Sequence, residues 1–173
     1  MIEELVLTVI ARDRPGLVKT LSETIAERGG NWIDSSMARL GGEFAGILRV
    51  SVASSEAAAL EKALAKLADA GITVVIRKGE TSAAERGGRR VRLALMGVDH
   101  TGIVHRISSA LAALDISIDD LETRVFPGSM SGEPMFEAKA EIVLPEDVEE
   151  AKLRTTLEAL AKDIVVDLEL APV

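Results

Sequence analysis

The sequence repeats itself at a fixed spacing, and this repeat limits the folds that are open to the chain. The run IARDRPGL over Ile10–Leu17 returns 86 residues later as MGVDHTGI over Met96–Ile103. A repeat of this length indicates two copies of one supersecondary unit. Up to Leu40, with no gaps at this offset, seven pairs are identical: Leu7/Leu93, Asp13/Asp99, Gly16/Gly102, Val18/Val104, Ser22/Ser108, Ala26/Ala112 and Asp34/Asp120.

Each copy has the pattern strand, helix, strand, strand, helix, strand. In the first copy an apolar strand leads into a turn, and Leu17, Leu21 and Ile25 then recur on one helical face. The glycine pair at 41–42 predicts a hairpin, and Ser54 or Ser55 is expected to cap the second helix. The remaining elements are strands over 31–40, 44–52 and 72–76 and a helix whose core face is Leu60, Leu64 and Leu67.

The second copy has the same elements in the same order. Its helices are marked by Ile103, Ile107, Leu111 and Leu114 and by Leu153, Leu157 and Leu160, and its later strands cover 117–126, 135–144 and 164–170. The offset grows to 93 by the second helix, so the extra residues are expected in the hairpin around 127–132. A duplicated βαββαβ unit predicts an α+β protein of two ferredoxin-like units, each an antiparallel four-stranded sheet with helices on one face. The predicted domains are 1–79 and 91–173.

The connection over residues 80–90 has no apolar periodicity, and six basic residues lie in and around it between Arg77 and Arg92. A nucleic-acid patch and a solvated linker both fit, and Glu80 and Glu85 favour the linker. The net charge of -8 and the scarcity of aromatic residues predict no direct nucleic-acid binding. The sequence has no cysteine and no apolar run of the ~20 residues that cross a bilayer, which predicts a cytoplasmic protein that contacts no membrane.

Two motifs carry a family resemblance. Asp13-Arg14-Pro15-Gly16-Leu17 and the run NWIDSSMARLGGEF over residues 31–44 resemble tandem ACT domains, and among them the group of glycine cleavage system transcriptional repressors. The second copy matches less fully: Asp99-His100-Thr101-Gly102 has no proline, and Ser117 stands in place of the asparagine.

The resemblance implies that a small effector, most often an amino acid, binds at an interface between two domains. Glycine is among the candidate effectors. The implied ligand-binding residues are those of the two turns and of the starts of the following strands: Asp13, Pro15, Gly16, Leu17 and Asn31, then Asp99, Gly102, Ile103 and Ser117. No cofactor and no catalytic residue are implied.

The chemistry of the turns agrees with this reading but is less specific. Free N–H groups at a helix N-terminus suit a carboxylate, and Asp13 could hold an ammonium group. The alternative is that Asp13 and Asp99 only cap their helices. We expect the first turn to be the better site and Gly16 to be its most sensitive residue. With a negative φ, Gly16→Val would change the free energy of folding by only about 1 kcal/mol.

Other groups give weaker signals for chemistry. His100 and His105 are the only histidines, and their spacing does not place them on one helical face. The acidic runs over 119–122 and 146–150 are expected to be solvated rather than to bind a metal. Asp119 and Asp120 are expected on opposite faces of a strand.

The sequence therefore predicts a non-enzymatic regulatory protein that binds an amino acid and controls transcription or metabolism through a protein partner. Two alternatives stay open: a small α+β enzyme acting on an amino acid, and an assembly module without a ligand. The strand from Leu5 to Ile10 is apolar on both faces. Its second face therefore has to be covered, either by a second chain in a homodimer or by the other unit.

Overall fold

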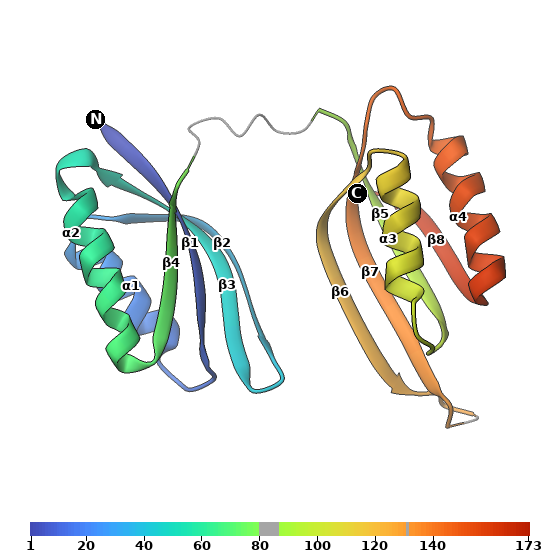
Figure 1. The fold of residues 1–173 in the computed structure, drawn as a ribbon, viewed down its shortest axis with the longest axis horizontal. Coiled ribbons are helices and arrows are strands. Elements are labelled where there is room, and N and C mark those ends of the chain that lie inside the picture. Colours follow the sequence, from blue (N-terminus) through green and yellow to red (C-terminus); the bar gives the residue numbers. More distant parts are fainter. Residues whose placement is uncertain (80–86, 131) are drawn as a thin grey trace. The chain divides into compact units, whose positions relative to one another are not determined.

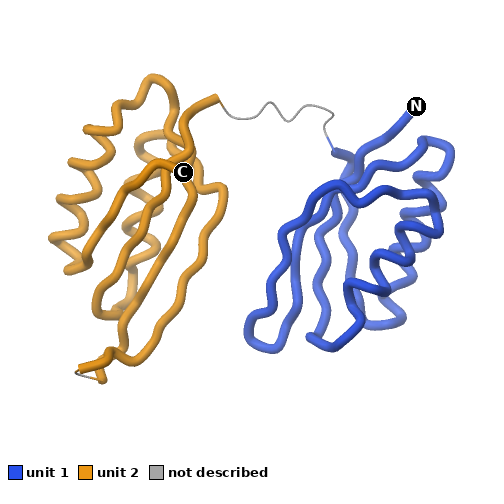
Figure 2. Tube along the Cα trace, turned by 180° about the vertical axis from the view of Figure 1, so that it is seen from behind, with its two compact units in different colours: residues 1–83 blue, residues 84–173 orange. Residues whose placement is uncertain are grey.

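The computed structural model describes residues 1–79, 87–130 and 132–173 and divides into two compact units, 1–83 and 84–173 (Figures 1 and 2). Most of the predicted linker, 80–86, and Ser131 of the second hairpin lie outside the described residues. The first unit consists of β1 (Ile2–Arg12), α1 (Leu17–Glu27), β2 (Asn31–Leu40), β3 (Glu43–Ala53), α2 (Ser54–Ala65), the short 3₁₀ helix η1 (Lys66–Ala70) and β4 (Ile72–Lys78).

The second unit repeats this order. It consists of β5 (Arg89–Val98), α3 (Ile103–Ala113), β6 (Ser117–Pro127), β7 (Pro134–Leu144), α4 (Glu150–Ile164) and β8 (Val166–Pro172). The strand orders are β2-β3-β1-β4 and β6-β7-β5-β8, and all pairs are antiparallel. The prediction of two ferredoxin-like α+β units, each with a four-stranded antiparallel sheet, is confirmed.

In each unit both helices cover one face of the sheet, and the hydrophobic core lies between them (Figure 1). In the first unit Leu5, Leu7 and Val9 of β1 are buried against this layer because side chains alternate across a strand. In the second unit β7 follows the predicted alternation, with Phe136 and Ala138 buried and Lys139 between Ala138 and Ala140 exposed.

The opposite face of the first sheet carries apolar side chains. Thr8 of β1 pairs with Ile47 of β3 on one side and with Val75 of β4 on the other. Ile47 is 56% exposed, Val75 51% and nearby Ile10 47%. We call these three side chains together with Val6 the open-face patch. The second face of β1 is therefore apolar, as the sequence indicates, and no helix of its own unit covers it.

Two local predictions are wrong. Neither Ser54 nor Ser55 caps α2: the helix starts at Ser54, its N-cap is Ala53, and the Ser54 hydroxyl donates to the Met1 carbonyl at 3.1 Å. Ile164, assigned from its spacing to the last strand, is the final residue of α4 instead. Apolar spacing does not separate a helix end from a strand start in this case, because Val165 alone stands between the two elements.

Candidate functional site

The turn between β1 and α1 is held by the backbone. Gly16 sits at the N-cap of α1 with φ 90 and ψ 2, and its carbonyl accepts the first helical hydrogen bond from the Thr20 amide at 2.9 Å. The Asp13 amide donates to the Gly42 carbonyl in the neighbouring hairpin at 3.0 Å. The left-handed conformation at residue 16 explains the glycine, because a side chain is strained there.

The turn between β5 and α3 has the same geometry. Gly102 has φ 92 and ψ -1, and its carbonyl accepts from the Arg106 amide at 3.0 Å. The Asp99 amide donates to the Pro134 carbonyl at 2.8 Å, as Asp13 does to Gly42. The sequence repeat thus extends to individual dihedral angles and hydrogen bonds, and both turns open onto the N-terminus of a helix.

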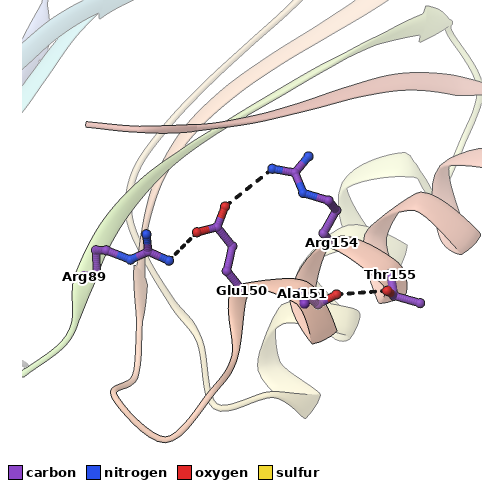
Figure 3. A network of polar contacts seen from close by, with 5 residues as sticks. All are labelled: Arg89, Glu150, Ala151, Arg154 and Thr155. Atoms are coloured by element: carbon purple, nitrogen blue, oxygen red, sulfur yellow. Dashed lines mark hydrogen bonds and ion pairs between the residues drawn. The ribbon is translucent and has the colours of Figure 1, made fainter.

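Neither of these helix N-termini is capped by a side chain, and neither helix has an acidic residue in its first turn. The second helix of each unit differs, because Glu56 lies in the first turn of α2 and Glu150 in that of α4. Figure 3 shows the Glu150 carboxylate between Arg89 and Arg154, which both donate to it. The hydrogen bond from Arg89 is the main reason that the pKa of Glu150 lies below its usual range. A negative group thus already occupies the start of α4, whereas α1 and α3 present their positive ends to an external anion.

Asp13 has a different role from a cap. Its carboxylate accepts a hydrogen bond from Arg39 of β2 at 3.2 Å, and α1 has no side-chain cap. The same holds for α3, so Asp99 does not cap either. The capping alternative is therefore wrong for both aspartates. The Arg39 side chain is 72% exposed, so this ion pair faces solvent and contributes little to stability.

The predicted residues of one unit do not all lie together. Pro15, Gly16 and Leu17 follow Asp13 in the turn, but Asn31 pairs with Ser51, and Ser51 pairs with Glu4. The nine steps along the strand from Glu4 to Asp13 span about 30 Å. Asn31 and Asp13 therefore mark opposite ends of the same sheet.

The second unit repeats this separation. Ser117 pairs with Val143, which pairs with Arg90, so Ser117 and Asp99 also lie about 30 Å apart. Gly102 and Ile103 stay with Asp99 at the turn. No single unit can bring both halves of the predicted residue set to one ligand of amino-acid size.

Sequence reasoning missed one residue in each turn. Arg14 donates a hydrogen bond to the Ala70 carbonyl before β4, and His100, at the same position of the second turn, places Nε2 2.9 Å from the Ile164 carbonyl before β8. In both units this side chain ties the first strand–helix turn to the last helix–strand turn. The repeat aligns Arg14 with His100, but only the fold shows that the two reach equivalent carbonyls.

Gly16 has no close neighbour: a Cβ built on it would meet no atom within 4 Å, and the same is true of Gly102. The small effect of about 1 kcal/mol expected for Gly16→Val assumed a negative φ at Gly16. The observed φ is positive, so this assumption does not hold. A β-branched residue there would be strained, so this variant alters folding as well as any ligand contact.

Across the described ranges 1–79, 87–130 and 132–173, no three histidine or acidic side chains gather in a group that could hold a metal ion. In the same residues, no helix has the length and apolar character needed to cross a membrane.

Residues 3–77 match the ACT domain family, so the first unit is an ACT domain. The second unit has the same element order, sheet order and turn geometry, and the protein is therefore a tandem ACT-fold protein.

Several known proteins are similar to this one along nearly the whole chain. The glycine cleavage system transcriptional repressor of Escherichia coli K12 is 23% identical over 161 residues, which cover 92% of this chain and 85% of the repressor. The crystal structure of an unknown protein from Galdieria sulphuraria superposes with a TM-score of 0.84 at 28% identity, covering 100% of this chain and 99% of that one. A structure provisionally assigned as a glycine cleavage system transcriptional repressor gives a TM-score of 0.74 at 20% identity, covering 100% and 98%, and shows the shared fold.

Proposed function

We propose that the protein is a non-enzymatic regulator that binds an amino acid between two ACT-fold units and acts on transcription or metabolism through a protein partner. The separation of the predicted residues carries this proposal. Asp13 and Asn31 lie at opposite ends of one sheet, so a small ligand that contacts both needs the turn of one unit and the β2 start of another. The repressor similarity supports the regulatory role and the link to transcription.

The chemistry of the turn suits an amino acid. The uncapped N-terminus of α1 offers N–H groups to the carboxylate. The Asp13 carboxylate, bound so far to one exposed arginine, can accept an ammonium group as well. The amide of Asn31, from a second unit, can bind either group. This arrangement holds both ends of the ligand and supplies no nucleophile, which favours binding over turnover.

Calorimetry and thermal-shift measurements on the full chain against the twenty amino acids test the proposal. A bound effector at ~100 times its Kd should raise stability by roughly 2.7 kcal/mol. Asp13→Ala should weaken binding by roughly 1.5–3 kcal/mol, the value of a charged hydrogen bond. Asp34→Ala is the matched control, because Asp34 also forms an exposed ion pair, with Arg49 at 2.9 Å. Absence of binding by every amino acid would overturn the proposal.

Mixing two variants tests whether the site needs two units. Asp13→Ala and Asn31→Ala should each reduce binding although the two residues lie about 30 Å apart in one unit. If the site forms between the first units of two chains, the mixture contains sites that keep both native residues, and part of the binding returns. If only Asp13→Ala weakens binding, the site lies within one turn.

A further inference from the structure

The second unit contains an apolar pocket between α3 and its sheet. Its volume is about 30 Å³. Ile103, Ile107 and Leu111 line it from the helix, and Ala138 and Ala140 line it from β7. Of all its lining residues only Ser108 is polar. A water molecule needs two to four polar partners to be stable in such a place, so the pocket favours an apolar group.

The second unit has smaller side chains than the first at three positions on the helix-covered face of its sheet, and two of these three residues line the pocket. In the first unit Trp32 and Met37 pack against the core and Leu48 is buried in it. At one position the second unit has the larger residue, because Ala138 stands where the first unit has Gly46. A Cβ added to Gly46 would lie 2.4 Å from Met37 Cγ. By strand register, the residues that replace the three larger side chains in the second unit are Ile118, Thr123 and Ala140.

The exposed part of the pocket lining lies on α3 and on β6, the edge strand of the sheet. Val104 is 42% exposed, Ile118 37% and Leu121 45%, so apolar side chains surround its mouth. Ile103, the first helical residue after Gly102, forms part of its wall. The pocket therefore reaches the N-terminus of α3, the counterpart in the second unit of the α1 N-terminus at which the proposed function places a carboxylate.

We infer that this pocket takes the short aliphatic side chain of an effector bound at the second turn, so that the second unit selects small apolar amino acids. This inference rests on the proposed function. A space of about one water volume admits a methyl group, and longer chains enter only as the exposed residues at the mouth adjust. Glycine has no side chain to fill the pocket, and a polar side chain would find only apolar neighbours and Ser108 there.

A homologous series measures the selectivity. Binding of glycine, alanine, 2-aminobutyrate and norvaline to the full chain is compared by calorimetry. Each added methylene that enters the pocket should tighten binding about fourfold until the pocket is full. An affinity that does not change along the series overturns the inference.

Two variants fill the pocket, one from each side. Ala140→Val narrows it from β7, and Ile118→Trp restores the residue type that the first unit has at the same position. Either should abolish the gain along the series. Ala94→Val is the matched control, because Ala94 lies on β5 between two lining residues and points to the other face of the sheet.

The outcomes separate the two proposals. The proposed function and the pocket inference are both supported if the longer amino acids bind more tightly, if Ala140→Val and Ile118→Trp remove this gain, and if Ala94→Val keeps it. Amino-acid binding that both pocket variants leave unchanged overturns the pocket and leaves the proposed function intact. No binding by any amino acid overturns both.

Discussion

The His100 side chain joins the second turn to the end of α4, with Nε2 2.9 Å from the carbonyl oxygen of Ile164. The other ring nitrogen, Nδ1, lies 3.0 Å from the Thr101 carbonyl oxygen. A neutral imidazole can donate only one hydrogen bond, whereas the protonated ring can donate both. The Ile164 contact and then the Thr101 contact raise the pKa of His100; Asp99 raises it further, and partial desolvation and Arg106 oppose the shift.

We expect the stability of the second unit to depend on pH through His100. Because the folded-state pKa lies above the usual 6.5, the stabilisation is fully present below pH 6.5 and is lost as the pH rises through the raised value. His100→Arg should remove this dependence, since Arg14 makes the equivalent contact with a permanent charge. Asp99 and Arg106, the charged groups that act on His100, and Asp163, which pairs with Arg106, are unchanged in this variant.

Thermal unfolding between pH 5.5 and 8.5 checks this expectation. NMR titration of the two histidines gives the pKa directly, with His100→Gln assigning the signals. Identical pH profiles for the native chain and His100→Arg would contradict the prediction.

We expect Val165→Gly to stabilise the second unit by about 1 kcal/mol. Val165 has φ 57, a left-handed conformation that is costly for a β-branched residue. The sheet register places Gly71, with φ 77, at the same position of the first unit. The reverse change, Gly71→Val, should destabilise the first unit, because a side chain there is strained although it has space. Chemical denaturation of both variants measures the two effects, and a less stable Val165→Gly protein would show that strain is absent.

We expect Asp13→Ala to change the free energy of unfolding by less than about 1 kcal/mol without ligand. The reason is that Asp13 does not cap α1 and that its ion pair with Arg39 is largely exposed. A double-mutant cycle with Arg39→Ala in urea gives the pair energy. A loss of 2 kcal/mol or more would mean that Asp13 supports the helix after all.

We expect Ile47→Lys to weaken self-association of the chain. Ile47 lies in the open-face patch and is 56% exposed, so the substitution should leave stability within about 0.5 kcal/mol. Sedimentation velocity over a range of concentrations measures the effect. Ala58→Lys, on the exposed side of α2, is the control for added charge. A native chain that sediments as a monomer at all concentrations would contradict the expectation.

Periodicity and the repeat predict most of the fold, because the buried face of a helix leaves a regular spacing of apolar residues in a short stretch of sequence. Leu17, Leu21 and Ile25 in the first unit show this spacing. The β-bulges after Trp32 and Ile118 are different. A bulge adds one residue to a strand without a sequence signature of its own, so simple alternation fails around Asp119. The Asp119 carboxylate lies 3.9 Å from Arg90. Arg90 pairs with Val143 and Asp120 pairs with Glu141, two positions on the same face of the sheet. Asp119 and Asp120 therefore do not lie on opposite faces as expected.

The candidate site is predictable in part for the same reason. The glycine turns are local, and both are visible in the repeat. The distance between Asp13 and Asn31 depends on the pairing of three strands, and the contact from His100 to Ile164 crosses 64 residues of sequence. Neither relation leaves a mark in a short window of sequence.

The separate hydrophobic cores of the two units have a consequence for cooperativity. Each core is built from residues of its own half, so each half can open in its own unfolding equilibrium, and native-state hydrogen exchange should resolve the two. An effector held between two units, as we propose, would lose contacts whenever either one opened. Binding of the effector would therefore couple the unfolding of the two units. A partner could recognise this change in dynamics without any shift in the average structure.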